Sequence, residues 1–508
     1  MYDKFKMNHY SKISNNVKKS EFSKSLQENI NLFKQEIFKD DETVIYRYFR
    51  NKEKDMQFCL IFVDGMADGK IINDNILKPI IYTSMKENLE YNEILDYIMQ
   101  NVLITDEIKK IYDITTAIDF ILYGDALLLI DGIDEIICID AKGWETRAIS
   151  EPLSETVIRG PREGFTECMS VNVSLIRRKI NSNKLKFKFR ELGTVTKTKI
   201  CICYIDDLVS KQILNELYKR LDKIKIDGIL ESGYIEELIK DHPASTFKTI
   251  GNSERPDAVA GMLLEGKIAL ICDGTPFVLT IPFVFQEYFQ NSEDYYNNFI
   301  YGSFNRLLRI LGFMLTTSVP AIYVALTTFH QEMIPTQLML SIAAAVEGVP
   351  FPPAIEAVMM LTTFEILREA GTRLPKNIGQ AVSIVGALVL GEAAASANIV
   401  SAPMVIVVGI TGISSFLIPK MLGPVVIIRI ICLILASILG LYGYIFAVIG
   451  ISFYLFSLKS FGVDYMLKIG SINKLDLKDT AIRAPWWFTE NNPKFVFSKL
   501  VNKYKGSR

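Results

Sequence analysis

The sequence predicts a membrane protein with an N-terminal cytoplasmic α/β domain made of two related subdomains, followed by an α-helical multi-span transmembrane domain with one broken helix. Three observations support this fold class. Charged residues occur every few positions of the 508-residue chain up to about Arg309. Beyond that point, the runs 310–331, 393–419 and 430–458 contain no Asp, Glu, Lys or Arg. Within the charged part, two segments repeat each other without a gap.

We expect the chain to have five parts. They are a polar N-terminal extension (1–40), a first α/β subdomain (41–195), a second α/β subdomain (196–300), a transmembrane helical domain (301–460) and a basic cytoplasmic tail (461–508). The first residues lack the basic-then-apolar pattern of a secretory signal, so we expect the α/β part to stay on the cytoplasmic side. The net charge of −1 gives no overall attraction to nucleic acid, which we exclude as a partner.

The two subdomains are predicted from a repeat within the charged part. The segment from Cys59 to Gly132 matches the segment from Cys201 to Gly274, with corresponding residues 142 positions apart. The matching landmarks are short β-branched runs that end in Asp, which is typical of buried strands followed by a turn or a helix cap. Helical patterns, such as the apolar stripe within 206–225, lie between these runs. Strands alternating with helices indicate α/β layers.

Four aspartates end the predicted strands, namely Asp64, Asp131, Asp206 and Asp273. Such carboxylates could hold a metal ion or a phosphoryl group. An Asp after a strand is more often a turn former or N-cap, and we favour that interpretation. The sequence has no Gly-rich phosphate loop, no HExxH or CxxC motif and only three His. We therefore predict no enzymatic activity, no metal and no cofactor.

The seven cysteines lie mostly in apolar, strand-like runs, and no His stands at ligand spacing from them. Cysteine is a small hydrophobic residue when it is buried, and metal sites need several ligands at regular spacing. We predict that the cysteines are reduced and buried.

Two loops rich in Pro, Gly and Arg are candidates for contacts between subdomains or subunits. Rigid turns that display Arg suit the bidentate capture of carboxylates. We favour structural ion pairing at such a contact, and binding of an anionic ligand is the alternative. The candidate contact residues are Arg159, Arg162, Glu163, Arg177, Arg178, Glu254, Arg255 and Asp257.

The uncharged runs predict about six membrane crossings. An apolar run of 18 or more residues can cross the ~30 Å hydrocarbon core as a helix. Arg306 and Arg309 before the first run, Lys420 between later runs and the basic tail mark the cytoplasmic side by the positive-inside rule. The last run, 425–458, is expected to form a hairpin around Gly440–Gly443. A single tilted span with an interfacial helix would instead give five crossings.

The segment 347–353, which contains a Gly and three Pro, divides the second apolar stretch into 335–346 and 354–367. A broken helix at membrane depth persists only where its freed backbone groups face protein or water. Glu392 lies in an otherwise uncharged span, where a carboxylate should face a water path, a partner or an ion, unless it lies at the outer headgroups. Glu365 and Arg368 should pair at the inner interface. The candidate ion-path residues are Glu392, Glu356, Pro350, Pro352, Pro353 and Ser396.

Long, ordered motifs over about residues 40–490 resemble the A subunits of GerA-type spore germinant receptors. Two departures are mild, because Ser253 stands where the family usually has Thr, and Glu392 stands where Gln or Glu is expected. The motifs that carry the resemblance are Glu151-Pro152, Arg159–Phe165, Asn172, Leu175–Arg178, Glu254–Asp257, Asp273–Phe277, Val349–Pro352 and Phe364–Pro375.

The resemblance implies a nutrient-sensing receptor subunit in the spore inner membrane, with the N-terminal domain and the C-terminal tail on the cytoplasmic (spore core) side. It implies a permease-like B subunit and a lipoprotein C subunit as partners, besides membrane lipid. It also implies a homo-oligomer that conducts monovalent cations. We favour a gated cation channel that triggers germination. A non-conducting signalling scaffold and a transporter-like subunit of the same complex are the alternatives.

Overall fold

The computed structural model describes residues 22–52, 56–83, 91–143, 152, 155–373, 386, 389–466 and 482–485. The predicted C-terminal tail falls largely outside these residues. Of the predicted N-terminal extension, residues 22–40 are described, and Phe22, Leu26 and Phe33 pack in the core of the first sheet. The chain divides into two compact units, which are described separately. Among the described residues, the first unit comprises those up to 240 and 250–282, and the second comprises 241–249 and those from 283 onward.

The first unit contains two five-stranded sheets, each with antiparallel pairing throughout. The first sheet has the strand order β1-β2-β4-β5-β3, and the second has the order β6-β7-β9-β10-β8. The strands of the first sheet are β1 (Val44–Arg50), β2 (Gln57–Val63), β3 (Ile108–Ile111), β4 (Ala126–Ile130) and β5 (Ile136–Ile139). Those of the second are β6 (Leu185–Leu192), β7 (Thr198–Ile205), β8 (Gly251–Ser253), β9 (Ile268–Cys272) and β10 (Val278–Ile281).

The two sheets therefore have the same topology, with each strand replaced by its counterpart. The offset of 142 positions holds for β4 and β9, for β5 and β10, and for the helices α6 (Ile114–Leu122) and α10 (Pro256–Leu264). The glycines after α6 and α10, Gly124 and Gly266, both have a positive φ, as do Gly132 and Gly274 after β4 and β9. The predicted pair of related α/β subdomains is present as these two sheets and their helices.

Helices cover both faces of the first sheet, which explains why its strands β4 and β5 are continuously apolar. All five residues of β4 are buried. Leu128 and Ile130 pack with the helices between β2 and β3, whereas Leu127 and Leu129 pack with α2 and α6. Successive side chains of a strand point to opposite faces, so a strand buried on both sides needs an apolar residue at every position.

The remaining helices of the first unit are mostly short. In the second subdomain, α8 lies within the predicted apolar stripe and buries Ile213, Leu214, Leu217 and Leu221. The helices are α2 (Leu26–Asn31), η1 (Leu32–Ile37), α3 (Gly69–Ile71), η2 (Ile72–Leu77), α4 (Lys78–Tyr82), α5 (Tyr91–Tyr97), η3 (Ile98–Val102), α7 (Met169–Lys179), α8 (Lys211–Leu221) and α9 (Ser232–Ile239).

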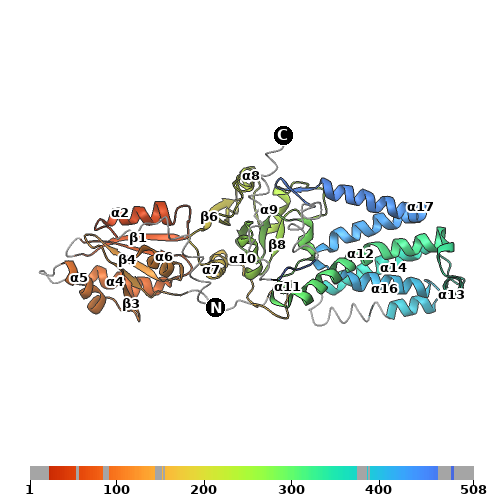
Figure 1. Cartoon of the computed structure of the whole chain (residues 1–508), viewed down its shortest axis with the longest axis horizontal. Coiled ribbons are helices and arrows are strands. Elements are labelled where there is room, and N and C mark those ends of the chain that lie inside the picture. Colours follow the sequence, from red (N-terminus) through yellow and green to blue (C-terminus); the bar gives the residue numbers. More distant parts are fainter. Residues whose placement is uncertain are drawn as a thin grey trace. The chain divides into compact units, whose positions relative to one another are not determined.

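The second unit is helical (Figure 1). The predicted break in the second apolar stretch is present, since α13 ends at Val346 and α14 begins at Pro353. A proline is tolerated in the first turn of a helix, which allows α14 to begin there. The helices of this unit are η4 (Phe285–Phe289), α11 (Glu293–Tyr296), α12 (Phe299–Phe329), η5 (Gln331–Met333), α13 (Thr336–Val346), α14 (Pro353–Thr372), α16 (Ala402–Ser415), η6 (Pro419–Met421) and α17 (Leu422–Ser457). The short strands β11 (Lys459–Ser460) and β12 (Val463–Asp464) follow α17.

The helix α17 folds back on itself at Gly440, as Figure 1 shows. Gly440 has φ 62° and ψ −141°, a conformation that residues with a Cβ rarely adopt. Gly443 then lies so close to the first arm that an added Cβ would stand 2.0 Å from the Leu435 carbonyl oxygen. The predicted hairpin around Gly440–Gly443 is therefore confirmed.

We expect Gly443→Ala to destabilise this hairpin by about 1–3 kcal/mol, because the new methyl group meets backbone rather than a flexible side chain. Thermal unfolding of the full chain in detergent measures the effect. The matched control is Gly450→Ala in the second arm, since nothing lies within 4 Å of a Cβ at that position. Equal unfolding temperatures for the two variants would contradict the close approach of the arms.

Two helical segments of the described chain are long and apolar enough to cross a membrane, Phe299–Phe329 and Pro419–Ser457. Their mean hydropathies are 1.7 and 2.7, and 39% of each apolar window is buried inside the unit, so most of each window faces outward. The helices α13 and α16 are apolar but have only 11 and 14 residues, short of the ~20 that a span needs. The span predicted at 378–396 lies partly outside the described residues.

Six of the seven cysteines are buried and free, as predicted, whereas Cys168 is exposed. Burial raises the pKa of Cys59, Cys138 and Cys272 to about 12. The prediction is wrong for Cys168 because this residue stands at the N-cap of α7 and not inside a strand.

Candidate functional site

A buried ion pair joins the two subdomains of the first unit. Arg177 lies on α7, which packs against the second sheet, and Asp41 precedes β1 of the first sheet. The Arg177 Nη2 donates to Asp41 Oδ2 at 2.6 Å and to Thr43 Oγ1 at 2.7 Å. Both charged side chains are 0% exposed. The guanidinium also lies 4.7 Å from the centre of the Phe187 ring, so a cation–π contact adds to the pair.

Further contacts reinforce this junction. Lys188 Nζ pairs with Asp40 Oδ1 at 2.9 Å, and the Phe189 backbone N–H donates to Glu42 Oε2 at 2.9 Å. Burial lowers the pKa of Lys186, and the nearby Asp41 carboxylate opposes this shift. Charged groups from β6 therefore meet the segment before β1 around the Arg177–Asp41 pair. The arrangement suits a rigid connection between the two subdomains better than a ligand site.

The two Arg-rich loops predicted from the sequence come together at Arg255, which is 1% exposed. Its Nη2 donates to the Pro161 carbonyl oxygen at 2.9 Å and to Asp257 Oδ2 at 2.8 Å. The Phe165 N–H donates to the Glu254 carbonyl oxygen at 2.8 Å. One loop thus holds the other in place.

The other contact candidates lie at the surface of this unit. Glu163 pairs with Lys179 at 3.0 Å and with Arg178 at 3.7 Å. Arg159 and Arg162 are exposed, and so is Arg178. Arg159, Arg162 and Arg178 thus differ in exposure from the buried Arg177 and Arg255.

Two of the four strand-ending aspartates cap helices. Asp131 Oδ1 accepts a hydrogen bond from the Leu26 N–H at 3.2 Å, and Asp273 Oδ1 accepts one from the Met169 N–H at 3.1 Å. These N–H groups belong to the first residues of α2 and α7. The favoured interpretation as turn and cap residues fits both, and no group of three His, Cys, Asp or Glu suited to a metal occurs in the described part of the chain.

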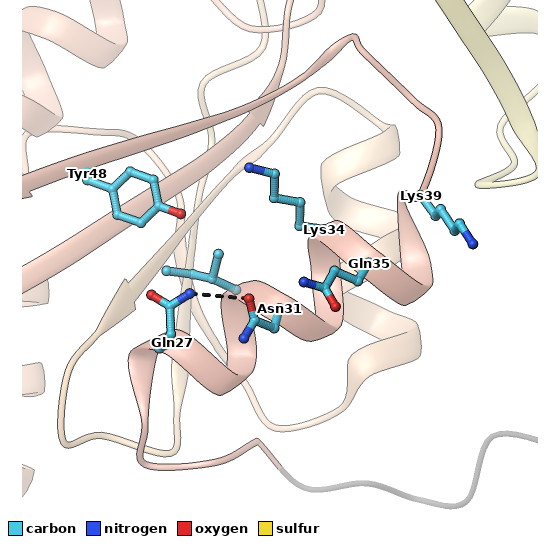
Figure 2. Close-up of a pocket in the computed structure, with 7 residues that line it drawn as sticks. Gln27, Asn31, Lys34, Gln35, Lys39 and Tyr48 are labelled. Carbon is cyan, nitrogen blue, oxygen red and sulfur yellow. Dashed lines mark hydrogen bonds between the residues drawn. The ribbon is translucent and has the colours of Figure 1, made fainter.

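A shallow cavity of about 540 Å³ lies beside α2 and β1 (Figure 2). Figure 2 shows Gln27 donating to Asn31 Oδ1, at 3.2 Å, along one wall. The cavity is lined by Gln27, Ile30, Asn31, Lys34, Gln35, Lys39 and Tyr48. Its polar groups are amides, ammonium groups and a tyrosine hydroxyl of surface side chains, and no buried polar group among these residues points to a particular ligand.

The helical unit buries a carboxylate among apolar side chains. Glu356 on α14 is 0% exposed, and its Oε2 accepts a hydrogen bond from the Ser401 N–H at 2.7 Å. Ser401 is the N-cap of α16, so the carboxylate lies at the positive end of that helix dipole. The surrounding core residues are Val324, Ala357, Leu361, Met404, Val407, Val408 and Leu433.

One carboxylate oxygen of this cluster, Glu356 Oε1, has no hydrogen-bond partner in the described part of the chain. The Tyr323 hydroxyl on α12 is within hydrogen-bonding reach of the Ser401 side chain and feels the charge of Glu356. A buried polar atom without a partner is costly, so such a cluster is suited to receive a cation, a proton or water.

The other ion-path candidates are not brought to Glu356. Glu392 and Ser396 lie in the helical stretch 389–396 and are exposed on the surface of the single chain. Pro350 and Pro352 are exposed in the break between α13 and α14, and Pro353 starts α14. The break lies near the end of the Glu392 stretch, because a Cβ at Gly348 would be 3.5 Å from the Asn398 side chain.

Two charge clusters of this unit were not predicted as sites. Arg306 and Arg309, which the sequence indicated only as a cytoplasmic flank, both pair with buried Asp294. Arg429 of α17 is 2% exposed and pairs with Glu365 at 2.5 Å. The predicted Glu365–Arg368 pair is also present. A lone Arg between apolar residues of a candidate span was the signal that could have identified Arg429.

These features define a class of protein in which a duplicated α/β domain precedes a helical unit with candidate membrane spans and buried charge. The family profile described as Bacillus/Clostridium GerA spore germination protein matches residues 32–495. The chain belongs to this GerA family, as the motifs predicted.

Relatives in Bacillus subtilis (strain 168) share most of their length with this chain. Spore germination protein KA is 42% identical over 476 residues, which cover 93% of this chain and 87% of the relative. Uncharacterized membrane protein YfkQ is 42% identical over 436 residues, which cover 85% of this chain and 84% of the relative. The crystal structure of the N-terminal domain of the A subunit of the Bacillus megaterium spore germinant receptor GerK3 aligns with 53% of this chain and 99% of its own, at 30% identity and a TM-score of 0.43.

Proposed function

We propose that this protein is the A subunit of a nutrient-sensing germinant receptor in the spore inner membrane. Membership of the GerA family and the relatives that are named spore germination proteins support this role. The proposed complex contains a permease-like B subunit and a lipoprotein C subunit. The α/β domain and the C-terminal tail lie on the cytoplasmic side.

The proposed membrane domain spans about residues 301–460 and follows the two α/β subdomains. The boundary between the subdomains lies before α7 and not at 195/196, because β6 lies in the second sheet and α7 packs against it. The crossings of the membrane domain are α12, the two arms of α17 and the segments around the break and Glu392. The fold-back at Gly440 supports two crossings in α17, because it turns one 39-residue candidate segment into two arms. The name of the membrane protein YfkQ supports a membrane location.

We further propose that several copies assemble into a gated channel for monovalent cations. The observation that carries this proposal is the buried cluster of Glu356, Ser401 and Tyr323, in which Glu356 Oε1 has no hydrogen-bond partner among the described residues. Oxygen donors around a carboxylate suit cations. Glu392, exposed on the single chain, would face the pore of the assembly. Nutrient bound to the partner subunits opens the pore by favouring the open arrangement of the helices.

Cation flux through liposomes that contain the purified full chain tests this function. Glu356→Gln keeps the shape of the side chain but removes the charge, and we expect the flux to fall at least ~tenfold. The control is Glu369→Gln, because Glu369 is exposed and pairs with the equally exposed Arg373 at the end of the same helix.

Each alternative predicts a different outcome of the same assay. A wild-type chain that releases no cations, while spores still need it to germinate, supports the non-conducting scaffold. Uptake of a nutrient without cation release supports the transporter-like subunit. Equal flux through wild type and Glu356→Gln would remove this cluster from the ion path.

A further inference from the structure

Two arginines share one carboxylate inside the helical unit. Glu365 and Arg368 lie one turn apart on α14, and Arg429 comes from α17. Arg429 Nη2 donates to Glu365 Oε1 at 2.5 Å, and Arg368 Nη2 pairs with Glu365 Oε2. One negative charge faces two positive charges, so this Glu365–Arg368–Arg429 cluster carries a net charge of +1.

Several guanidinium N–H groups of the cluster have no acceptor among the described residues. Arg429 Nε, Arg429 Nη1 and Arg368 Nη1 are buried and lack a hydrogen-bond partner in the described part of the chain. A buried charged donor without an acceptor is strongly unfavourable, so native proteins provide one. Three unmade donors on two guanidinium groups, with one surplus positive charge, call for an anion with several oxygens.

The cluster is accessible from the surface at one side. Arg429 is almost fully enclosed, whereas the side chains of Arg368 and Glu365 are 20% and 23% exposed. Arg429 lies in the early part of α17, which follows Lys420 and the 3₁₀ turn η6. The opening is therefore at the end of an apolar arm, where a helix would leave the hydrocarbon core.

The chemistry of this position selects a phosphate. Planar guanidinium groups bind tetrahedral oxyanions through paired N–H groups. Basic pockets between membrane helices on the cytoplasmic side bind anionic lipid head groups. We propose that Arg368 and Arg429 hold the phosphate of an anionic lipid head group, with Glu365 positioning both guanidinium groups. This inference rests on the helical unit lying in a bilayer, as proposed above.

Lipid-dependent thermal unfolding of the purified full chain in a neutral detergent tests the proposal. Phosphatidylglycerol is titrated against phosphatidylcholine with the same acyl chains, and inorganic phosphate forms a third arm. We expect phosphatidylglycerol to raise the unfolding temperature by at least ~2 °C and phosphatidylcholine to leave it unchanged. An equal effect of inorganic phosphate at the same concentration would overturn the lipid as the source of the phosphate. If neither phosphatidylglycerol nor inorganic phosphate raises the unfolding temperature, the proposed phosphate site is wrong.

Variants separate a binding site from a purely structural ion pair. Arg429→Gln should weaken the phosphatidylglycerol response at least ~tenfold in concentration. Arg373→Gln is the control, because the Arg373 side chain on the same helix is 77% exposed and should not alter the response.

Glu365→Gln keeps both arginines and removes their shared carboxylate. We expect it to lower the unfolding temperature without lipid and to enlarge the shift that phosphatidylglycerol causes, because the anion then replaces the lost charge. A variant that is destabilised equally with and without the lipid would overturn the proposal. This readout is independent of cation flux, so failure of the channel function and failure of this site are distinguishable.

Discussion

Arg177→Met is expected to destabilise the α/β unit by about 3–5 kcal/mol, because it leaves Asp41 buried without its counter-charge. Both side chains of the pair are fully enclosed, so water cannot replace the lost guanidinium. The substitution also removes the hydrogen bond to Thr43 and the contact with the Phe187 ring. The loss should appear in both subdomains, since the pair joins the segment before β1 to α7.

Hydrogen exchange of the full chain, followed by mass spectrometry on peptides from β1 and β6, measures this loss as the free energy of opening. The control is Lys184→Ala, whose pair with Asp207 is exposed and should contribute less than ~1 kcal/mol. Protection that changes no more in Arg177→Met than in the control would contradict the role assigned to the pair.

The double variant Asp41→Leu with Arg177→Met provides a further check. Removing both charges eliminates the buried unpaired carboxylate, so the double variant should be less destabilised than the sum of the single variants. Additive losses would mean that the two side chains act independently.

Asp294→Asn is expected to destabilise the helical unit by about 3–5 kcal/mol, because one carboxylate serves two arginines. Arg309 donates to its two oxygens at 2.8 and 2.7 Å, and Arg306 approaches Oδ2 to 3.4 Å. Asp294 is 1% exposed and Arg306 is fully buried. Without the carboxylate, Arg306 and Arg309 near the start of α12 both lose this ion pair.

The thermal unfolding temperature and the folded yield of the full chain in detergent report this loss. Asp464→Asn is the matched control, since Asp464 and its partner Lys459 are both exposed and should contribute less than ~1 kcal/mol. A normal unfolding temperature for Asp294→Asn would show that Arg306 and Arg309 do not need this carboxylate.

The repeat could be predicted because its signals are local. Each landmark strand of the repeat is a short apolar run that ends in Asp. Each turn glycine of the first segment has a counterpart in the second segment at the same offset. The hairpin of α17 was predictable for the same reason, because Gly440 and Gly443 interrupt an apolar run. The broken helix likewise follows from prolines that cannot continue a helix.

Two of the buried ion pairs were not predictable because their partners are distant in sequence. Arg177 and Asp41 lie 136 positions apart, and Arg429 and Glu365 lie 64 apart. The sequence indicated that Arg177 is a contact residue, but it did not identify Asp41 as its partner. Similarly, it indicated Glu356 as a polar residue after the break, but not the α16 helix whose first turn it caps.

The burial of most cysteines allows the protein to be labelled with a dye at a single native position. Maleimide dyes react with thiolates at the surface, and six thiols of this chain are enclosed. Cys168 is therefore a natural single attachment point that requires no engineered replacement of the others. It stands at the N-cap of α7, the helix that carries Arg177, so a dye there would report any rearrangement between the two subdomains.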